Sequence, residues 1–550
     1  MSTTGQRTEI ETVPVLIVGG SLVGLSTSLF LSFYGIPSLL VERHSGISPH
    51  PRAFNFNMRT MEIFRSVAAE EAIRRKAPPH FQNSGILQAE SLVGREFGWI
   101  TQDTTSSDLS PLAGCIIGQD VLEPVLRARA LELGSAMRFS TEFVAFEQDS
   151  DGVNAVIRDR VSGAESNVRA RYLVAADGNR SAIRQQLGIK TFGPGLIGHQ
   201  FSILFQADVE GPLRGRKLAV CFVNNPGVRK GTSLVFARNG DGFALFTPYR
   251  PDEEQEADFA GERGIELVRA AVGVPDLSVE ILNVTPWEVA AWAAQRFQEG
   301  RVFLAGDSAH VTPPAGAFGA NTGIADAYNL AWKLALVLQE QAGPELLRTY
   351  SEERQPVVRG TTEQSFAMFT RFSAGPGGAQ GGTPILPYNS IAFGYRYQGE
   401  HIPAESSEQG AFENPHEPSG HPGSHAAHVV LHQGERQFST LDLFGKHFVL
   451  LTGAQGSYWR EPASKVAASL GLPLDIYQIA GEDGFASLDQ RFLSAYGLRE
   501  DGAVLVRPDG FIAWRAVTTE QHPAEAIEQA LRLQFVQTAG KAQKEAIFSH

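Results

Sequence analysis

Cysteine is almost absent from this sequence: Cys115 and Cys221 are the only two in 550 residues. They lie far apart and form neither a Cys-x-x-Cys pair nor a metal-binding spacing. A disulfide framework, a cysteine-based zinc site and dithiol redox chemistry are therefore excluded. So few cysteines indicate a reducing compartment, and we expect a cytoplasmic protein.

Long apolar runs and an excess of basic residues are also lacking. The only long apolar window, Val13 to Val41, is interrupted by glycines, and the polar N-terminus has no signal-peptide pattern. We therefore expect no transmembrane helix and no membrane partner. The net charge of −13 argues against binding to nucleic acid.

The composition that remains is globular. At 43% apolar and 19% charged residues, 550 residues can form two to four domains with large cores. Phenylalanine is abundant, with 34 residues against 6 Trp and 11 Tyr. This is compatible with a core or pocket of apolar aromatic surface.

The most informative stretch runs from Arg301 to Ala335. A short strand ends at Gly306-Asp307, a Pro/Gly loop follows, and a helix with apolar residues at helical spacing begins near Asn321. A carboxylate at a strand end can accept hydrogen bonds from a polyol, and a glycine-rich loop admits a flat ligand. A helix N-terminus stabilises negative charge. These features together favour a flavin, although an ordinary strand–loop–helix turn is the alternative for this stretch alone.

A second motif near the N-terminus favours the flavin interpretation. Val13 to Val18 is an expected strand, Gly19 to Gly24 a glycine turn opening a helix, and Ser38 to Val41 a second strand that ends at Glu42. This is the context of a dinucleotide fingerprint, with the pyrophosphate on the helix N-terminus and the acid on the ribose. Ser21 replaces the middle glycine and still leaves room for a phosphate.

A third strand ends on an acid and a glycine, at Asp177-Gly178. The three motifs, GGSLVG with Glu42, AADGNRSAIR and GDSAHVTPPAGAFGANTGIADAYNLAWKLA, resemble those of the class A flavin-dependent aromatic hydroxylases, the para-hydroxybenzoate hydroxylase-like family. They follow the family's order across roughly residues 13–360, and bacterial enzymes that tailor aromatic polyketides or antibiotics are the most similar members. Ser21 and Ala317 depart from the family's glycines, but both are small, so we expect FAD to bind.

The resemblance implies an α/β fold with three parts. Residues 1–190 and 285–395 would form a Rossmann-like FAD-binding domain of the glutathione reductase type, and residues 191–284 an inserted, mostly antiparallel β-sheet domain for the substrate. A linker, 396–425, would precede a thioredoxin-like C-terminal domain, 426–550, without Cys-x-x-Cys. We expect that domain to be structural or an interaction surface.

The resemblance also implies an FAD-dependent monooxygenase. NADPH or NADH would bind transiently, because no second dinucleotide fingerprint is visible, and would reduce the FAD. Dioxygen would then give a flavin C4a-hydroperoxide that hydroxylates a large planar aromatic substrate of polyketide type. The cofactor carries this chemistry, so we assign no catalytic side chain and no metal, and expect Pro314 and Asn321 to line the flavin ring.

The expected cofactor-binding residues come from these motifs and from loops between them. We expect Arg52 to reach the pyrophosphate or the ring and Gln119 to reach the ribityl chain or the ring. The full set is Gly19, Gly20, Ser21, Leu22, Val23, Gly24, Glu42, Arg43, Arg52, Gln119, Val144, Asp177, Gly178, Gly306, Asp307, Pro314, Gly316, Gly319, Ala320, Asn321 and Thr322.

Several stretches carry weaker expectations. Residues 80–112 are polar and read as an irregular excursion, and two helices are expected at 344–353 and 357–372. Six histidines between His401 and His432 invite a metal interpretation, but their spacing fits no common ligand pattern. We favour a solvated linker.

The FAD motifs leave the reaction open. Baeyer–Villiger insertion, epoxidation and oxidative decarboxylation occur on the same scaffold, and a non-catalytic flavin-binding scaffold that recruits a partner is an alternative of another class. A tryptophan halogenase is disfavoured, because no Trp-x-Trp pair occurs. Homo-oligomerisation is an open alternative.

Overall fold

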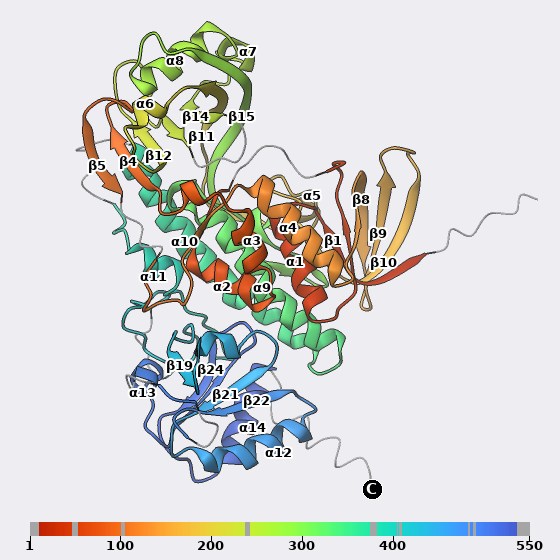
Figure 1. Cartoon of the computed structure of the whole chain (residues 1–550). Coiled ribbons are helices and arrows are strands. Elements are labelled where there is room, and N and C mark those ends of the chain that lie inside the picture. The colour runs from red at the N-terminus through yellow and green to blue at the C-terminus, as the bar shows by residue number, and fades with distance from the viewer. Residues whose placement is uncertain are drawn as a thin grey trace, which may run out of the picture.

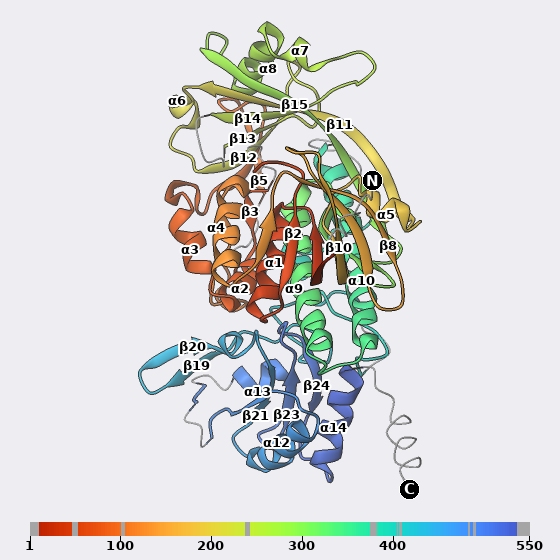
Figure 2. The same ribbon diagram turned by 90° about the vertical axis from the view of Figure 1, so that its right-hand side faces the viewer.

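Three bodies are stacked along the long axis of the molecule (Figures 1 and 2). A β-sheet domain lies at one end, a mixed α/β domain in the middle and the C-terminal domain, drawn in blue, at the other end. The computed structural model describes residues 10–46, 53–100, 105–236, 242–373, 382–403, 405, 410–481, 485–487 and 491–535. Within that part of the chain, no helix has the length and apolar character needed to cross a membrane.

The central domain is built on a mostly parallel sheet. Its first strand, β1, pairs in parallel with β2 on one side and β10 on the other. The predicted β-α-β unit at the N-terminus is therefore confirmed. The strands are, in spatial order, β16 (Gln298–Glu299), β17 (Val302–Leu304), β10 (Glu165–Ala175), β1 (Glu11–Val18), β2 (Ser38–Val41) and β7 (Ala136–Arg138), with β8 (Thr141–Gln148) and β9 (Val153–Asp159) attached to β10.

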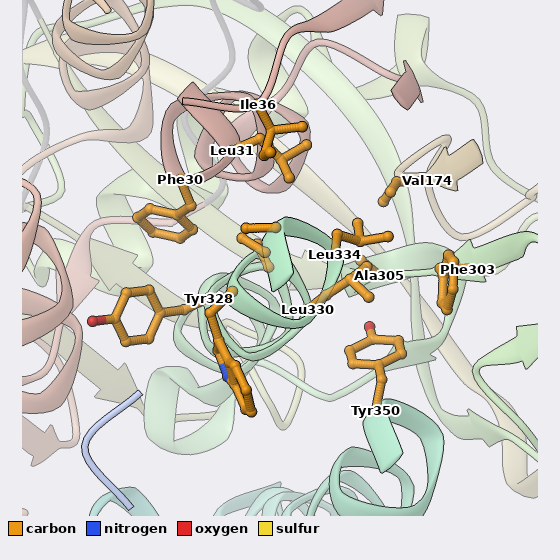
Figure 3. Packing of buried hydrophobic residues seen from close by; sticks show 14 of the residues in the cluster. Phe30, Leu31, Ile36, Val174, Phe303, Ala305, Tyr328, Leu330, Leu334 and Tyr350 are labelled. Atoms are coloured by element: carbon orange, nitrogen blue, oxygen red, sulfur yellow. The ribbon is translucent and has the colours of Figure 1, made fainter. Parts of the chain in front are cut away.

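Helix α9 (Phe318–Leu338) runs through the middle of this domain and is buried on nearly every side, as expected for a helix that is apolar all round. Phe30 and Tyr328 meet edge to face with ring centroids 5.2 Å apart (Figure 3). The Tyr350 hydroxyl donates to the carbonyl oxygen of Leu304 at 2.7 Å, which fastens the next long helix to β17. The other helices of this domain are α1 (Leu22–Phe33), α2 (Met58–Ser66), α3 (Glu70–Lys76), α4 (Gln119–Glu132), α5 (Ala182–Gln186), α10 (Arg348–Ser373) and α11 (Tyr388–Ala392).

The prediction of two helices after the central stretch is wrong. A short 3-10 turn, Pro344–Leu347, leads into one continuous helix, α10, which passes through Pro356. A proline removes one helical hydrogen bond and disfavours helix in the residue before it. Burial of Val357, Val358 and Thr361 against the core compensates for that loss.

The second sheet is mostly antiparallel, as predicted, but it is larger than the sequence indicated. Residues 80–112 were expected to be irregular, and this is wrong: β4 (Gly85–Ala89) pairs in parallel with β12, and β5 (Glu96–Ile100) forms the sheet edge. The remaining strands, in spatial order, are β18 (His310–Val311), β15 (Val279–Ala294), β11 (Thr191–Ala207), β14 (Phe243–Pro248), β13 (Ser233–Val235) and β12 (Leu218–Val223).

One face of this sheet is covered by helices α7 (Glu256–Phe259) and α8 (Glu262–Val272), which lie on its outer side in Figure 1. Leu87, Cys221, Leu234 and Leu245 form a cross-strand row on that face and are buried. Because successive side chains alternate between faces, their neighbours in sequence face the central domain.

The C-terminal domain is built on a four-stranded sheet. Its sheet runs β22 (Leu474–Gln478), β21 (Phe448–Thr452), β23 (Ala503–Val506) and β24 (Ile512–Ala516). Helices α12 (Arg460–Ser469), α13 (Arg491–Tyr496) and α14 (Pro523–Gln534) pack around it, with a hairpin of β19 (Val430–Gln433) and β20 (Arg436–Ser439).

The histidines before this domain are not uniformly solvated, which corrects the expectation for this stretch. His401 is 2% exposed and hydrogen-bonds Glu353 of α10 at 2.6 Å, and His428 is 6% exposed and bonds the Ser439 hydroxyl. Histidine can be buried once a ring nitrogen has a hydrogen-bond partner, and neither partner could be identified from the spacing of the histidines. The division of the chain into domains at the expected residue numbers stays a prediction.

Candidate active site

The first glycine turn is packed tightly against the protein's own backbone. Gly19 has φ +109°, and a Cβ there would lie 2.2 Å from the carbonyl oxygen of Ala176. A Cβ on Gly24 would lie 1.9 Å from the carbonyl oxygen of Gly19. Both positions therefore require glycine, as the fingerprint predicted. Ser21 caps α1 without a side-chain hydrogen bond, so the first amides of α1 remain for an anion.

The structure explains why serine replaces the middle glycine. The Ser21 hydroxyl donates to Oε1 of Glu123 at 2.7 Å and accepts from Nε2 of Gln119 at 3.0 Å. Gln119 also donates to Glu123 at 2.7 Å. The serine side chain is therefore bound to α4. Gln119 is held beside the glycine turn, although it was predicted to reach the ribityl chain or the ring.

Glu42 lies at the end of β2 beside the same turn. Its Oε2 accepts from the amide of Gly20 at 2.6 Å, and its Oε1 accepts from the amide of His44 at 2.8 Å. Arg43 is exposed next to it. Val144 is 39% exposed at a bulge of β8, the strand whose first amide, Thr141, donates to the carbonyl of Glu42. This group is compatible with the ADP half of FAD.

The second glycine motif meets the first. A Cβ on Gly306 would lie 2.6 Å from Cγ2 of Val23 in the first turn of α1. The Gly306 amide donates to Oδ2 of Asp326 at 3.1 Å, and Asp307 is exposed at this turn. Two motifs far apart in sequence therefore share one edge of the sheet, as the carboxyl ends of parallel strands must.

Asp326 holds this turn from inside. Its Oδ2 also lies 2.7 Å from Nε2 of His310, and its Oδ1 accepts from Nε of Arg354 at 2.8 Å. Burial raises the pKa of this carboxyl, but His310 and Arg354 outweigh burial and hold it below its usual value. Asp326 is therefore an ionised residue that orients Gly306.

The Pro/Gly loop turns sharply before α9. Gly316 has φ +85° and Ala317 has φ +56°, so two successive residues are left-handed. Pro314 is exposed on this loop, and a Cβ on Gly319 would lie 3.0 Å from the hydroxyl of Thr312. The first turn of α9 contains Ala320, Asn321 and Thr322.

The side chain of Asn321 is fully engaged inside the protein. Its Oδ1 accepts from the amide of Asn57 at 3.0 Å and the hydroxyl of Thr60 at 2.6 Å. Its Nδ2 donates to the carbonyls of Asn55 at 3.0 Å and Ala317 at 2.7 Å. A contact with the flavin ring would therefore come from its backbone, and this residue chiefly ties the α9 N-terminus to α2.

The third motif lies beside the first. Gly178 has φ +85°, and Asp177 accepts from the amide of Ile183 at 3.4 Å. Burial raises the pKa of Asp177, and its Oδ1 is buried without a hydrogen-bond partner. A buried acceptor without a hydrogen bond destabilises the fold unless a ligand or a water molecule donates to it. Arg52 lies outside the described residues.

An aromatic surface that the motifs did not reveal faces the central domain. Cross-strand pairs place Phe246 opposite Ser202 and Ser233, and Phe222 opposite Ser233 and Gln88. Phe222 also contacts Phe372 at the end of α10, with centroids 5.9 Å apart. A cavity beside these rings is lined further by Phe97 and Lys230.

Trp287 extends this surface. It lies opposite Gln200, two residues before Ser202, and its ring meets Phe246 edge to face at 5.5 Å. The indole Nε1–H is buried and has no acceptor among the residues that the structure describes. Alternation of apolar residues in β12 and β14 was the only signal for these positions, and it does not say which face meets a ligand.

The residues present fit FAD. Two glycines keep the turn tight where a Cβ would clash with backbone, the N-terminus of α1 has no side-chain cap, Glu42 lies beside this turn, and Oδ1 of Asp177 has no hydrogen-bond partner among the described residues. These features lie along one edge of the central sheet. The individual contacts assigned to FAD stay predictions.

Comparison with known proteins agrees with this arrangement. Residues 12–365 match the family model of an FAD binding domain, and residues 419–537 match that of the aromatic-ring hydroxylase C-terminal domain. A 4-methyl-5-nitrocatechol 5-monooxygenase of Burkholderia sp. is 46% identical over 94% of this chain and 97% of its own length. A tetracenomycin A2 monooxygenase-dioxygenase of Streptomyces glaucescens is 39% identical over 96% and 98%.

Solved structures give the same result. The crystal structure of a ternary complex of aklavinone-11 hydroxylase with FAD and aklavinone superposes with a TM-score of 0.90, at 36% identity over 96% of this chain and 100% of that one. The expected fold, with a Rossmann-like FAD domain, a substrate sheet and a thioredoxin-like domain, is confirmed. The chain belongs to the family of FAD-dependent aromatic-ring hydroxylases, and it is an FAD-dependent monooxygenase.

Proposed function

We propose that this monooxygenase hydroxylates a large, planar, phenolic polycyclic substrate, with dioxygen as the oxidant and NADPH or NADH as the electron donor. The observation that carries the proposal is the row of Phe222, Phe246 and Trp287 on the sheet face above the FAD edge. Broad flat rings suit this surface because aromatic faces and edges pack favourably against one another. Relatives named for tetracenomycin and aklavinone support the same class of substrate.

Bound FAD supplies the activation of oxygen, and the chain's own residues bind and orient. Gly19 and Gly24 would keep the turn tight at the N-terminus of α1, where the pyrophosphate would bind, and Glu42 would accept hydrogen bonds from the ribose. The N-terminus of α9 stabilises negative charge on the ring, by about 0.3–1 kcal/mol when exposed and up to ~2 when partly buried. Asp326 keeps the Gly306 turn in place.

The substrate surface has few polar groups, and each can fix an orientation. The Trp287 Nε1–H has no acceptor in the part of the chain that the structure describes, so a carbonyl or phenol oxygen of the substrate would accept its hydrogen bond. Ser202, Ser233 and Gln88 share the face and can bond further oxygens. A small number of polar groups on an apolar wall is the usual composition of such a site.

The test is a screen of the purified, FAD-loaded enzyme against polycyclic phenols and naphthoquinones, with NADPH and NADH supplied in turn. We expect one compound to accelerate oxidation of the nicotinamide and to gain one oxygen atom on a ring carbon. A product whose fragmentation shows an ester or an epoxide would replace hydroxylation with Baeyer–Villiger insertion or epoxidation. Flavin without any stimulated turnover would favour a non-catalytic scaffold.

Monocyclic nitrocatechols are the second candidate class. The relative named for 4-methyl-5-nitrocatechol is 46% identical over nearly the whole chain, a higher identity than that to the tetracenomycin enzyme. The same screen therefore includes nitrocatechols. Faster turnover with them than with every polycycle would contradict the polycyclic assignment and leave the monooxygenase intact.

A further inference from the structure

A turn of the C-terminal domain enters the FAD-binding domain. The residues between β23 and β24 place Arg507 and Asp509 against helices α9 and α10, and both are 1% exposed. Arg507 donates to both oxygens of Glu353, at 2.6 Å and 2.8 Å, and to Asp509 at 3.0 Å. Domain contacts are commonly polar but seldom this deeply buried.

Two α9 side chains and a histidine complete an inter-domain cluster with Glu353, Arg507 and Asp509. Lys333 donates to Glu353 at 2.8 Å, and Asn329 donates to Glu353 at 2.7 Å and Asp509 at 3.1 Å. His401 lies 2.6 Å from Glu353. Burial raises the pKa of Glu353, but Arg507 and Lys333 outweigh burial and hold it well below its usual range. The carboxylates of Glu353 and Asp509 are therefore paired with the cations of Arg507 and Lys333. Removing one member of a pair would leave buried charge that is less well compensated.

One chain of contacts leads from this cluster to the Gly306 turn. Arg507 lies over the ring of Tyr397, 5.2 Å from its centroid. Arg354 donates to the Tyr397 hydroxyl at 3.4 Å and to Asp326 at 2.8 Å. Asp326 accepts the Gly306 amide. Each of these side chains is buried, so a displacement of Arg507 would have to move its protein neighbours.

A second chain of contacts leads to the start of α9. Arg59 of α2 donates to the carbonyl oxygen of Asp509 at 2.6 Å. Its neighbour Thr60, with Asn57 at the N-cap of α2, bonds Oδ1 of Asn321. The two chains reach two segments of the FAD edge, the Gly306 turn and the first turn of α9.

We propose that the C-terminal domain positions the FAD-binding loops, with Arg507 and Asp509 as positioning residues that act through Tyr397 and Arg354 on Gly306 and through Arg59 on Asn321. The inference rests on the FAD function of this edge and does not depend on the substrate. A buried ion pair is weak evidence for stability, because apolar residues of similar size often stabilise as much. Its value here is conformational: it fixes one arrangement of α2, α9 and α10.

The test measures the dissociation constant of FAD for the full-length apoprotein by quenching of flavin fluorescence, together with the visible spectrum of the bound flavin. We expect Arg507→Met and Asp509→Asn to weaken FAD binding about tenfold and to shift the flavin bands, with Arg507→Lys intermediate. Arg436→Met is the matched control, because Arg436 is an exposed arginine of the same domain, on the β19–β20 hairpin.

A second measurement separates positioning from stability. If Arg507 acts through Arg354, the losses of FAD affinity in Arg507→Lys and Arg354→Lys are not multiplicative in the double variant. Multiplicative losses, or folded variants that bind FAD like the wild type, would overturn the inference. A wild-type protein that binds no FAD would overturn the function of the whole edge. Suppose that the Arg507 variants bind FAD more weakly but the wild-type enzyme turns over no polycyclic substrate. That result would overturn only the proposed substrate.

Discussion

At the residue scale, the glycine turn makes the sharpest prediction. We expect Gly24→Ala to lower the affinity for FAD by roughly tenfold or more, because a Cβ 1.9 Å from the Gly19 carbonyl forces the turn open and such overpacking costs about 1–3 kcal/mol. The measurement is the FAD content and dissociation constant of the purified variant. Gly211→Ala is the control, since a Cβ at this helical glycine meets nothing within 4 Å. Equal FAD binding by Gly24→Ala and Gly211→Ala would contradict the assignment.

Trp287 gives a prediction for the substrate. We expect Trp287→Phe to raise the KM for the substrate about five- to tenfold with little change in kcat, because an aromatic ring remains at this position and one hydrogen bond of about 1 kcal/mol is lost. Trp99→Phe is the control on the same sheet, where the indole is 47% exposed and donates to Glu96. A KM that changes equally in the two variants would mean that the Trp287 Nε1–H does not contact the substrate.

Residues whose role is local could be predicted from sequence, and those whose role depends on distant partners could not. Gly19, Gly24 and Glu42 belong to one short β-α-β unit, whose geometry fixes their positions. The Ser21 hydroxyl was expected to leave room for a phosphate, but its partner Glu123 lies 102 residues away. The bonds of Asn321 to Asn57 and Thr60 could likewise not be inferred without the fold.

At the scale of elements, we expect substitutions at Gly316 and Ala317, in the loop before α9, to change the stability of the protein in opposite directions. Ala317 has φ +56°, and an L-residue there costs roughly 1–2 kcal/mol. Glycine loses about 0.4–1 kcal/mol more entropy on folding, so we expect Ala317→Gly to be neutral or to stabilise by up to ~1 kcal/mol.

Gly316→Ala is the partner variant. At φ +85° its Cβ would lie 2.2 Å from Cε2 of Phe318, so we expect destabilisation of more than ~1 kcal/mol. Denaturant unfolding of the two apoproteins measures both effects. Destabilisation by Ala317→Gly together with tolerance of Gly316→Ala would show that the loop has a different backbone.

Elements were predictable where their pattern is strong. β2 is an apolar strand that is buried throughout, β1 is apolar and buried over its last four residues, and α9 is buried along most of its length, so their patterns are easy to detect. β4 and β5 were missed because they lie at or near a sheet edge with mixed polarity, and their place is set by pairing with β12, over 100 residues later. α10 was divided at Pro356 because the local rule for proline is overridden by packing.

At the scale of the whole molecule, buried titratable groups make stability depend on pH. Burial lowers the pKa of His428 from 6.5 to about 4. Between these pH values the unfolded chain binds a proton at this histidine that the folded chain does not. The contribution of His428 to the free energy of unfolding therefore decreases as the pH falls from about 6.5 to about 4. We expect the free energy of unfolding of His428→Gln to fall less steeply across this window than that of the wild type.

The control for this prediction is His522→Gln, at an exposed histidine that makes no side-chain capping bond at α14. Its unfolding free energy should follow the wild-type slope. If His428→Gln also follows that slope, the ring is protonated in the folded state and its burial has no effect on acid stability.

The arrangement of the three bodies was only partly visible in the sequence. The thioredoxin-like order of elements after residue 439 was predictable, since each strand and helix has a clear pattern. The insertion of Arg507 between α9 and α10 was not, because arginine in a β-turn ordinarily lies in solvent. The aromatic face of the substrate sheet was also hidden, since abundant phenylalanine does not show where a cavity forms.

The most direct test of the account is turnover in an atmosphere of ¹⁸O₂, with the FAD-loaded enzyme, a nicotinamide donor and the phenolic substrate that stimulates it. The account predicts one ¹⁸O atom in each molecule of product and one molecule of nicotinamide oxidised per oxygen inserted. Product that gains an oxygen atom without ¹⁸O, which would then come from water, or a purified protein that holds no flavin, would contradict the assignment of a flavin monooxygenase to this site.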